Sequence, residues 1–288
     1  MTYFLNIRAQ SVGGDPVADS RDIKIIDVTN GTTKNVSPDE LITNIRGKDV
    51  LLTTHGFNVS QQDGINSLAL WQLRLTQPNN SVFIGILWPG DSAWLPCIDY
   101  PIEGNSATRS GRFLATFLNE LFMESTSISF VSHSLGARMV LETIRQLNPA
   151  RRVSNLILMA GAIDDDCLTN EYQDAACKVD KISVLASHGD CVLEFAFPTG
   201  NFLSGIISRG HPYWRAALGR EGPESITNIH LHSGGWQIPN DWSYGHGDYL
   251  SKTIGTPMSP PEDLPTLLPS IPADPSAWSA SFVSTRLK

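Results

Sequence analysis

The sequence predicts an α/β protein, a three-layer α/β/α sandwich around a mostly parallel sheet of about eight strands. Two observations carry this expectation. Short apolar runs typical of buried strands alternate with helical patterns along the chain, an order that builds parallel sheets with helices on both faces. The apolar run at residues 128–131 then breaks at a serine and passes at once into a helical pattern.

The domain organisation follows from length and composition. The 288 residues and the hydrophobic fraction of 41% allow one large domain with a sizeable core. We expect a single domain over residues 1–256, with inserted loops and helices near the site at 193–245, and a Pro-rich C-terminal extension over 257–288. Because proline interrupts helices and central strands, residues 257–275 should form an extended segment that wraps the body, or a partly disordered one.

Eight apolar runs are expected to form the strands. They lie at residues 3–9, 23–28, 50–54, 82–87, 128–131, 156–160, 182–186 and 226–231. A Gly-Gly-Asp-Pro turn joins the first two, so we expect these two strands to pair antiparallel at an edge of the sheet. The break at the serine follows the fifth of the eight strands.

Serine caps mark the helix starts. Ser37 precedes a proline, and Ser60 precedes Asp63 by three residues, the spacing of a reciprocal cap. Apolar pairs repeating every four residues predict a helix over 113–122, and an apolar stripe predicts another over 137–147.

The overall charge argues against nucleic acid and anionic membranes as partners, because the net charge is −8 and no basic block offsets it. The chain shows no signal-peptide pattern at its N-terminus and no apolar run near the ~18 residues of a membrane helix, so we expect a cytoplasmic protein. Cysteines at positions 97, 167, 177 and 191 are then expected to be reduced thiols, with a Cys167–Cys177 bridge as the alternative.

The pentapeptide at the strand break, Ser132-His133-Ser134-Leu135-Gly136, has the pattern of a nucleophile elbow. In such a turn the central serine is lifted over the end of the sheet, and small residues two positions before and after it avoid backbone collisions. Here Ser132 stands where the common pattern has glycine. The context predicts Ser134 as a nucleophile.

A serine nucleophile needs an acid further along the chain, after a later strand. Asp190 follows the strand predicted at 182–186 and is the first suitable acid. The run Asp164–Asp165–Asp166 follows the preceding strand and is the competing acid; otherwise it is a solvated loop that caps a short helix.

The base should be a histidine beyond the acid. His246, the last histidine of the chain, lies after the last predicted strand. The other histidines have more ordinary explanations. His230 and His232 share one strand face, where they could hold a metal but are more simply explained by hydrogen bonds at a sheet edge. His211 lies in an insertion. We expect His188 to support the loop of Asp190 and His133 to pack beneath the nucleophile.

Acyl chemistry also needs donors for an oxyanion. The elbow supplies the backbone N–H of Leu135 at the start of a helix. The second donor should lie on the loop after the strand at 50–54, where Gly56 lets the backbone turn so that the Phe57 N–H faces the site and His55 holds the loop.

Several stretches together resemble a little-characterised group of bacterial serine hydrolases of the α/β-hydrolase superfamily, over roughly residues 40–250. They are His-Gly-Phe-Asn (55–58), Trp-Pro (88–89), Asp-Tyr (99–100), Asn-Ser-Ala-x-x-Ser (105–110), Ser-His-Ser-Leu-Gly (132–136) and Ala-Gly-Ala-Ile-Asp (160–164). The resemblance implies an α/β-hydrolase fold, a triad of Ser134, Asp190 and His246, and oxyanion donors at Phe57 and Leu135. The chain departs from the group at Gly90, where a serine often follows Trp-Pro, and in the long segment between the acid and the base.

That long segment is rich in apolar residues that could line an acyl or aryl pocket or, alternatively, pack in the core of inserted helices. They are Phe195, Phe197, Phe202, Leu203, Ile206, Ile207, Tyr213, Trp214, Trp236 and Trp242. Trp88 and Trp94 would face them, which makes Trp88 a candidate substrate-binding residue.

The expected function is therefore hydrolysis of a small-molecule carboxylic ester through an acyl-enzyme intermediate, with neither a metal nor an organic cofactor. A thioesterase, an amidase or an acyltransferase would use the same site. A non-catalytic binding module is the alternative from another class, and the complete set of Ser134, Asp190 and His246 argues against it.

Overall fold

A single sheet of nine strands lies at the centre of the described residues in the computed structural model, which describes residues 2–11, 15–29, 32–91, 100–194, 216–225, 234–250 and 274–287. The strands are β1 (Thr2–Asn6), β2 (Lys24–Thr29), β3 (Thr32–Val36), β4 (Asp49–Thr54), β5 (Ser81–Leu87), β6 (Ser127–His133), β7 (Val153–Met159), β8 (Val179–Ala186) and β9 (Gly234–Gln237). Their order in the sheet is β3-β2-β1-β5-β4-β6-β7-β8-β9. All pairs from β1–β5 to β8–β9 are parallel, so the predicted mostly parallel sheet is confirmed.

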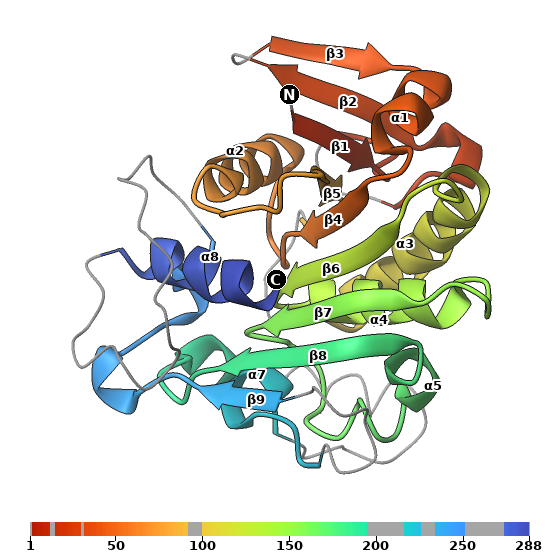
Figure 1. The fold of residues 1–288 in the computed structure, drawn as a ribbon. Helices are drawn as coiled ribbons and strands as arrows, with labels where there is room; N and C mark the ends of the chain where they lie inside the picture. Colours follow the sequence, from red (N-terminus) through yellow and green to blue (C-terminus); the bar gives the residue numbers. More distant parts are fainter. Residues whose placement is uncertain are drawn as a thin grey trace.

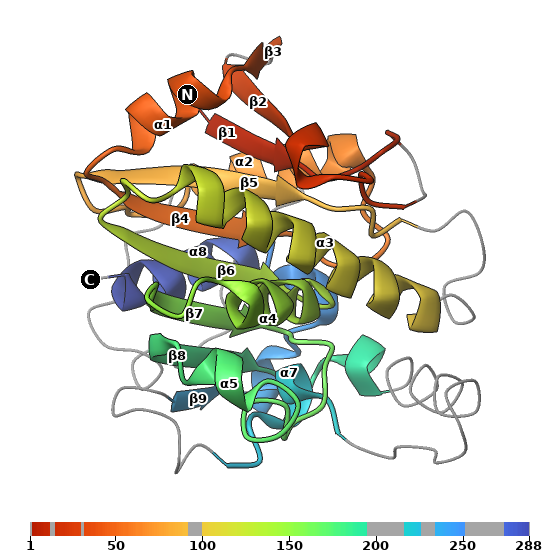
Figure 2. The same ribbon diagram turned by 90° about the vertical axis from the view of Figure 1, so that its right-hand side faces the viewer.

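Helices cover both faces of the sheet, as the three-layer prediction requires (Figure 1). The helices are α1 (Pro38–Ile45), α2 (Gln61–Gln72), α3 (Tyr100–Leu121), α4 (Gly136–Gln146), α5 (Gln173–Ala176), α7 (Leu218–Glu221) and α8 (Pro275–Arg286), with 3-10 turns η1 (Ser20–Asp22), η2 (Asn240–Trp242) and η3 (His246–Asp248). Figure 2 shows α3, α4 and α5 on one face, with α2 and α8 behind the sheet on the other. Because parallel strands end at the same edge, the loops after β4, β6 and β8 meet there.

The predicted strand count needs correction. β1 and β2 pair antiparallel as expected, but β3 forms the edge beyond them, so the serine turn follows the sixth strand rather than the fifth. The sequence signal for β3 was missing because four of its five residues are exposed and polar. At the opposite edge lies β9, whereas the strand predicted at 226–231 falls outside the described residues.

Both predicted helix starts are confirmed. The Ser37 side chain accepts a hydrogen bond from the Glu40 N–H at the start of α1. At the start of α2, the Ser60 hydroxyl accepts from the Asp63 N–H (3.2 Å) and donates to the Asp63 carboxylate (2.7 Å). These contacts satisfy donors that a helix N-terminus otherwise leaves unpaired.

Helix α8 lies in the segment assigned to the Pro-rich extension, where no helix was expected. Trp278 and Phe282 are fully buried, and the Trp71 indole of α2 donates to Ser279 (3.2 Å). At the start of α8, Asp274 forms an ion pair with Arg74 (2.8 Å). The helix thus completes the layer on the α2 face (Figure 1). Residues 251–273 fall outside the described residues.

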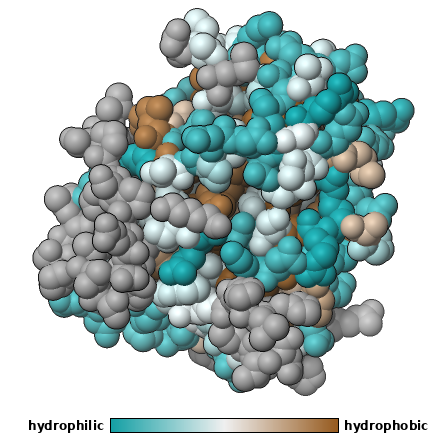
Figure 3. Space-filling model, viewed as in Figure 1, coloured by the Kyte–Doolittle hydropathy of each residue, from teal (hydrophilic) through white to brown (hydrophobic). Residues whose placement is uncertain are grey.

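The surface of the described residues is mainly hydrophilic on the face seen in Figure 3. The large exposed hydrophobic side chains of the described residues, Leu73, Met123 and Val192, lie in three separate segments, after α2, α3 and β8. In the described part of the chain, no helix combines the length and the apolar character that crossing a membrane requires. Cys167 and Cys177 are both free thiols, so the alternative of a bridge between them is wrong.

Candidate active site

The turn between β6 and α4 holds Ser134 in a rare backbone conformation. Its φ of 55° lies in the left-handed region, which few residues other than glycine occupy. Three hydrogen bonds fix the turn: the Ser134 N–H donates to the Met159 carbonyl (3.0 Å), and the Ser134 carbonyl accepts from the N–H groups of Ala137 (3.0 Å) and Ala162 (3.1 Å). This is the strained strand-to-helix turn that the pentapeptide predicts.

Two hydrogen bonds connect Ser134 with His246 and Asp190. His246 Nε2 lies 2.8 Å from Ser134 Oγ, and His246 Nδ1 lies 2.7 Å from Asp190 Oδ2. The three side chains come from the turn after β6, the loop after β8 and the turn η3. Asp190 is fully buried, and its Oδ1 accepts from the Leu193 N–H (3.0 Å). An ionised Asp190 only accepts, so His246 carries its proton on Nδ1, and Nε2 can accept the serine proton.

The competing acids lie in a different environment. Asp166 accepts a hydrogen bond from Asn170 (3.1 Å), and the backbone N–H of Asp165 donates to the Ala216 carbonyl (3.0 Å). Of the two candidate acids, the structure brings Asp190 to His246.

Two of the other candidate histidines, His133 and His188, lie within the described residues. His133 Nε2 donates to the His246 carbonyl (2.8 Å), and the two rings lie 4.9 Å apart. His188 pairs with Glu221 on the surface (3.2 Å). His211, His230 and His232 fall outside the described residues.

The loop after β4 runs directly beside Ser134. A Cβ atom at Gly56 would lie 2.6 Å from Ser134 Cβ and 3.2 Å from Ser134 Oγ. A Cβ atom at Gly136 would lie 2.6 Å from the His55 carbonyl oxygen. Glycine is therefore required on both sides of this contact, and the loop of Phe57 and the start of α4 at Leu135 flank the serine.

Trp88 supports this loop from below. Its side chain is fully buried, its Nε1 donates to the His55 carbonyl (3.0 Å), and its ring stacks on His55 at 5.8 Å. In the structure Trp88 holds the loop at His55, and its part in substrate binding stays a prediction. No motif in the sequence marks Arg8 and Asp91, the buried ion pair near Trp88.

Comparison with known proteins places this fold in a family. Residues 32–233 match the sequence model of a family described as "Alpha/beta hydrolase of unknown function (DUF900)", a match over more than half of the chain. The chain belongs to this family. None of the curated proteins compared with this α/β hydrolase matches it in sequence.

Solved structures of similar fold include three esterases or depolymerases. Acetyl xylan esterase 1 from Thermoanaerobacterium sp. shares 12% identity with a TM-score of 0.38, over 78% of this chain and 77% of that chain. A poly(3-hydroxybutyrate) depolymerase from Bordetella parapertussis shares 13% identity with a TM-score of 0.42, over 77% and 84%. An esterase from Pyrobaculum calidifontis shares 10% identity with a TM-score of 0.37, over 78% and 76%. With identities of 10–13% and TM-scores below 0.5, these likenesses carry no argument about this chain.

A cavity of about 380 Å³ in this α/β hydrolase is lined in part by His133 and Gly247, the chain neighbours of Ser134 and His246. It is lined by His55, Asn58, Val59, Asp63, Asn66, Ser67, Leu70, His133, Gly247 and Leu250. Of the predicted pocket aromatics, Trp242 is buried against Trp278 (5.2 Å) and Trp236 packs on Phe282 (5.5 Å). These two therefore belong to the packing of α8, while Trp94 and the set between 195 and 214 fall outside the described residues.

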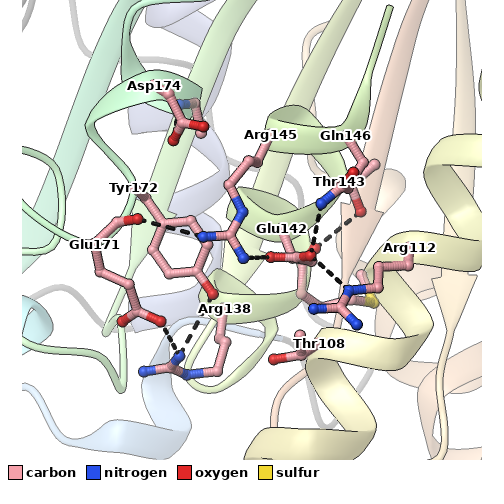
Figure 4. A network of polar contacts seen from close by, with 12 residues as sticks. Thr108, Arg112, Arg138, Glu142, Thr143, Arg145, Gln146, Glu171, Tyr172 and Asp174 are labelled. Atoms are coloured by element: carbon pink, nitrogen blue, oxygen red, sulfur yellow. Dashed lines mark hydrogen bonds and ion pairs between the residues drawn. The ribbon is translucent and has the colours of Figure 1, made fainter.

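A polar network holds α4, the helix whose first residue follows the serine turn (Figure 4). The buried Glu142 carboxylate accepts from Arg112 of α3 (2.9 Å), from Gln146 (3.1 Å) and from Arg145. The Arg145 guanidinium also lies 4.8 Å from the centre of the Tyr172 ring. Charge-assisted bonds of this kind fix the helix against its neighbours.

The imidazole of His55 is a buried titratable group in the loop beside the serine. Burial lowers the pKa of His55 to about 4, although its hydrogen bond to the Gly56 carbonyl partly opposes this effect. The unfolded chain would take up this proton near pH 6.5, the ordinary histidine value. Between these two pH values the unfolded state therefore binds more protons, and stability falls as the pH drops.

We therefore expect about 3 kcal/mol of folding free energy to be lost through His55 between pH 6.5 and pH 4. Urea denaturation of the wild type and of His55→Gln across this range measures the difference. The glutamine variant should lose less stability on acidification, because glutamine does not titrate. Parallel stability curves for the two proteins would contradict the assignment.

Proposed function

We propose that this α/β hydrolase cleaves carboxylic esters with Ser134 as nucleophile, His246 as general base and acid, and Asp190 as the group that orients His246. One observation carries the proposal: the continuous chain of hydrogen bonds from Ser134 Oγ through the His246 ring to Asp190, with lengths of 2.8 Å and 2.7 Å. A buried carboxylate, an imidazole and a serine hydroxyl in this order match the requirements of nucleophilic acyl transfer.

In the first half of the proposed reaction, Ser134 Oγ attacks the ester carbonyl carbon while His246 Nε2 takes the hydroxyl proton. The carbonyl oxygen becomes an oxyanion, which the N–H groups of Leu135 and Phe57 bind. The tetrahedral intermediate then expels the alkoxide, which takes the proton from His246 and leaves as the alcohol. Ser134 is left as an acyl ester.

In the second half, a water molecule gives its proton to His246 Nε2 and attacks the acyl carbon. The second tetrahedral intermediate collapses, Ser134 regains the proton, and the carboxylic acid leaves. Asp190 stabilises the imidazolium in both halves and keeps the Nδ1 proton in place. The scheme uses these three side chains, the backbone N–H groups of Leu135 and Phe57, and water.

A fluorophosphonate probe together with a panel of p-nitrophenyl esters tests the proposal. The probe should form one adduct per chain, and mass spectrometry should place it on Ser134. The panel should show turnover, with a preferred acyl length that describes the pocket. Labelling elsewhere would overturn the nucleophile assignment, and labelling of Ser134 without turnover of any ester would point to an amidase, a thioesterase or an acyltransferase.

A further inference from the structure

A buried arginine connects three of the loops beneath the candidate site. Arg8 follows β1, and its side chain is 0% exposed. It forms an ion pair with Asp91, which follows β5, and its Nη1 donates to the carbonyls of Trp88 (2.9 Å) and Val59 (3.3 Å). Burying an ion pair costs desolvation energy, so such a pair is weak evidence of a role in stability alone.

The contacts continue from Arg8 toward Ser134. Trp88, whose carbonyl Arg8 holds, donates its indole N–H to the His55 carbonyl (3.0 Å). His55 Nδ1 in turn donates to the Gly56 carbonyl (2.9 Å). The loop after β4 is thus held at its carbonyls by buried side-chain donors.

These contacts fix the orientation of the peptide between Gly56 and Phe57. In a trans peptide the C=O and N–H groups point in opposite directions. Because the Gly56 carbonyl is held by the His55 ring, the Phe57 N–H points away from that ring. The Gly56 backbone is also the part of the loop that closely approaches Ser134.

We propose that Arg8, Asp91 and Trp88 are positioning residues that preset the Gly56–Phe57 peptide as an oxyanion donor. The inference rests on the proposed function, since an oxyanion forms only if Ser134 attacks a carbonyl. Donors fixed before the reaction stabilise a developing charge without reorganising, so their loss lowers the rate rather than the binding of the substrate.

The test uses the full-length protein and two variants, Arg8→Met and Trp88→Phe. The first removes the guanidinium, and the second removes the indole N–H and part of the buried ring system while keeping an aromatic ring. We expect kcat for p-nitrophenyl acetate to fall about 100-fold in Arg8→Met and about 10-fold in Trp88→Phe, with KM changed only a few-fold. The inhibition constant of a trifluoromethyl ketone, whose adduct with serine carries the oxyanion, should rise by the same factor as kcat/KM falls.

Arg74→Met is the matched control, because Arg74 is also a buried arginine in an ion pair, with Asp274 at the start of α8. It should lower Tm while leaving the ketone affinity unchanged, measured well below Tm. If both Arg8→Met and Trp88→Phe keep the wild-type affinity for the ketone, the inference is overturned. If Arg8→Met does not fold, the ketone affinity of Trp88→Phe alone tests the inference. A wild-type protein that neither hydrolyses the ester nor binds the ketone would overturn the proposed function itself.

Discussion

Ser134→Ala is expected to lower kcat for p-nitrophenyl acetate by about 10⁶-fold, the scale seen when a nucleophile is removed from a serine hydrolase. The change deletes the only atom that forms the acyl-enzyme in the proposed scheme. The variant should fold, because the backbone hydrogen bonds that hold the turn do not involve the serine side chain. Ester hydrolysis at high protein concentration, with circular dichroism as the check on folding, measures the effect.

Ser110→Ala is the matched control for this prediction. Ser110 lies in α3, is 0% exposed, and has no hydrogen-bond partner for its hydroxyl among the described residues. The same chemical change there should leave kcat within a few-fold of the wild type. Substantial turnover by Ser134→Ala would remove Ser134 from the proposed mechanism, whatever Ser110→Ala does.

Asp190→Asn should lower kcat by about 10⁴-fold, although the amide has nearly the same size as the carboxylate. An amide can donate to His246 Nδ1, which favours the tautomer that carries its proton on Nε2. That tautomer cannot accept the Ser134 proton, and the neutral amide no longer stabilises the imidazolium. Steady-state kinetics with one ester measures the loss.

Asp165→Asn is the control for the acid. It lies in the run Asp164–Asp166, where the backbone N–H of Asp165 donates to the Ala216 carbonyl. Its kcat should stay close to that of the wild type. A rate that collapses in Asp165→Asn and survives in Asp190→Asn would move the acid to that loop.

Local patterns were sufficient to predict much of the fold and the residues that meet at the site. The apolar run of β6, ending in small residues, predicted the turn that holds Ser134 in the left-handed region. Parallel strands end at one edge, so chain order alone predicted that Asp190 and His246 would come near it. Their roles stay predictions until the variants are measured.

Other features left no readable pattern in the sequence. The polar, exposed residues of β3 lack the apolar alternation of a half-buried strand. In α8 the buried residues Ser276, Ser279, Ser281 and Ser284 look hydrophilic, yet the hydroxyls of Ser279 and Ser284 donate to backbone carbonyls and so tolerate burial. Arg8 and Asp91 lie far apart in sequence, and their pairing depends on how the sheet assembles.

The left-handed backbone at Ser134 sets folding stability against the proposed nucleophilic role of this residue. A residue with a Cβ atom pays about 1 kcal/mol or more of conformational strain there, and glycine would not. Selection for resistance to heat alone would therefore favour glycine at position 134. That substitution would remove the hydroxyl that the proposed mechanism needs. Thermostable variants isolated without an activity screen should be sequenced at this codon first.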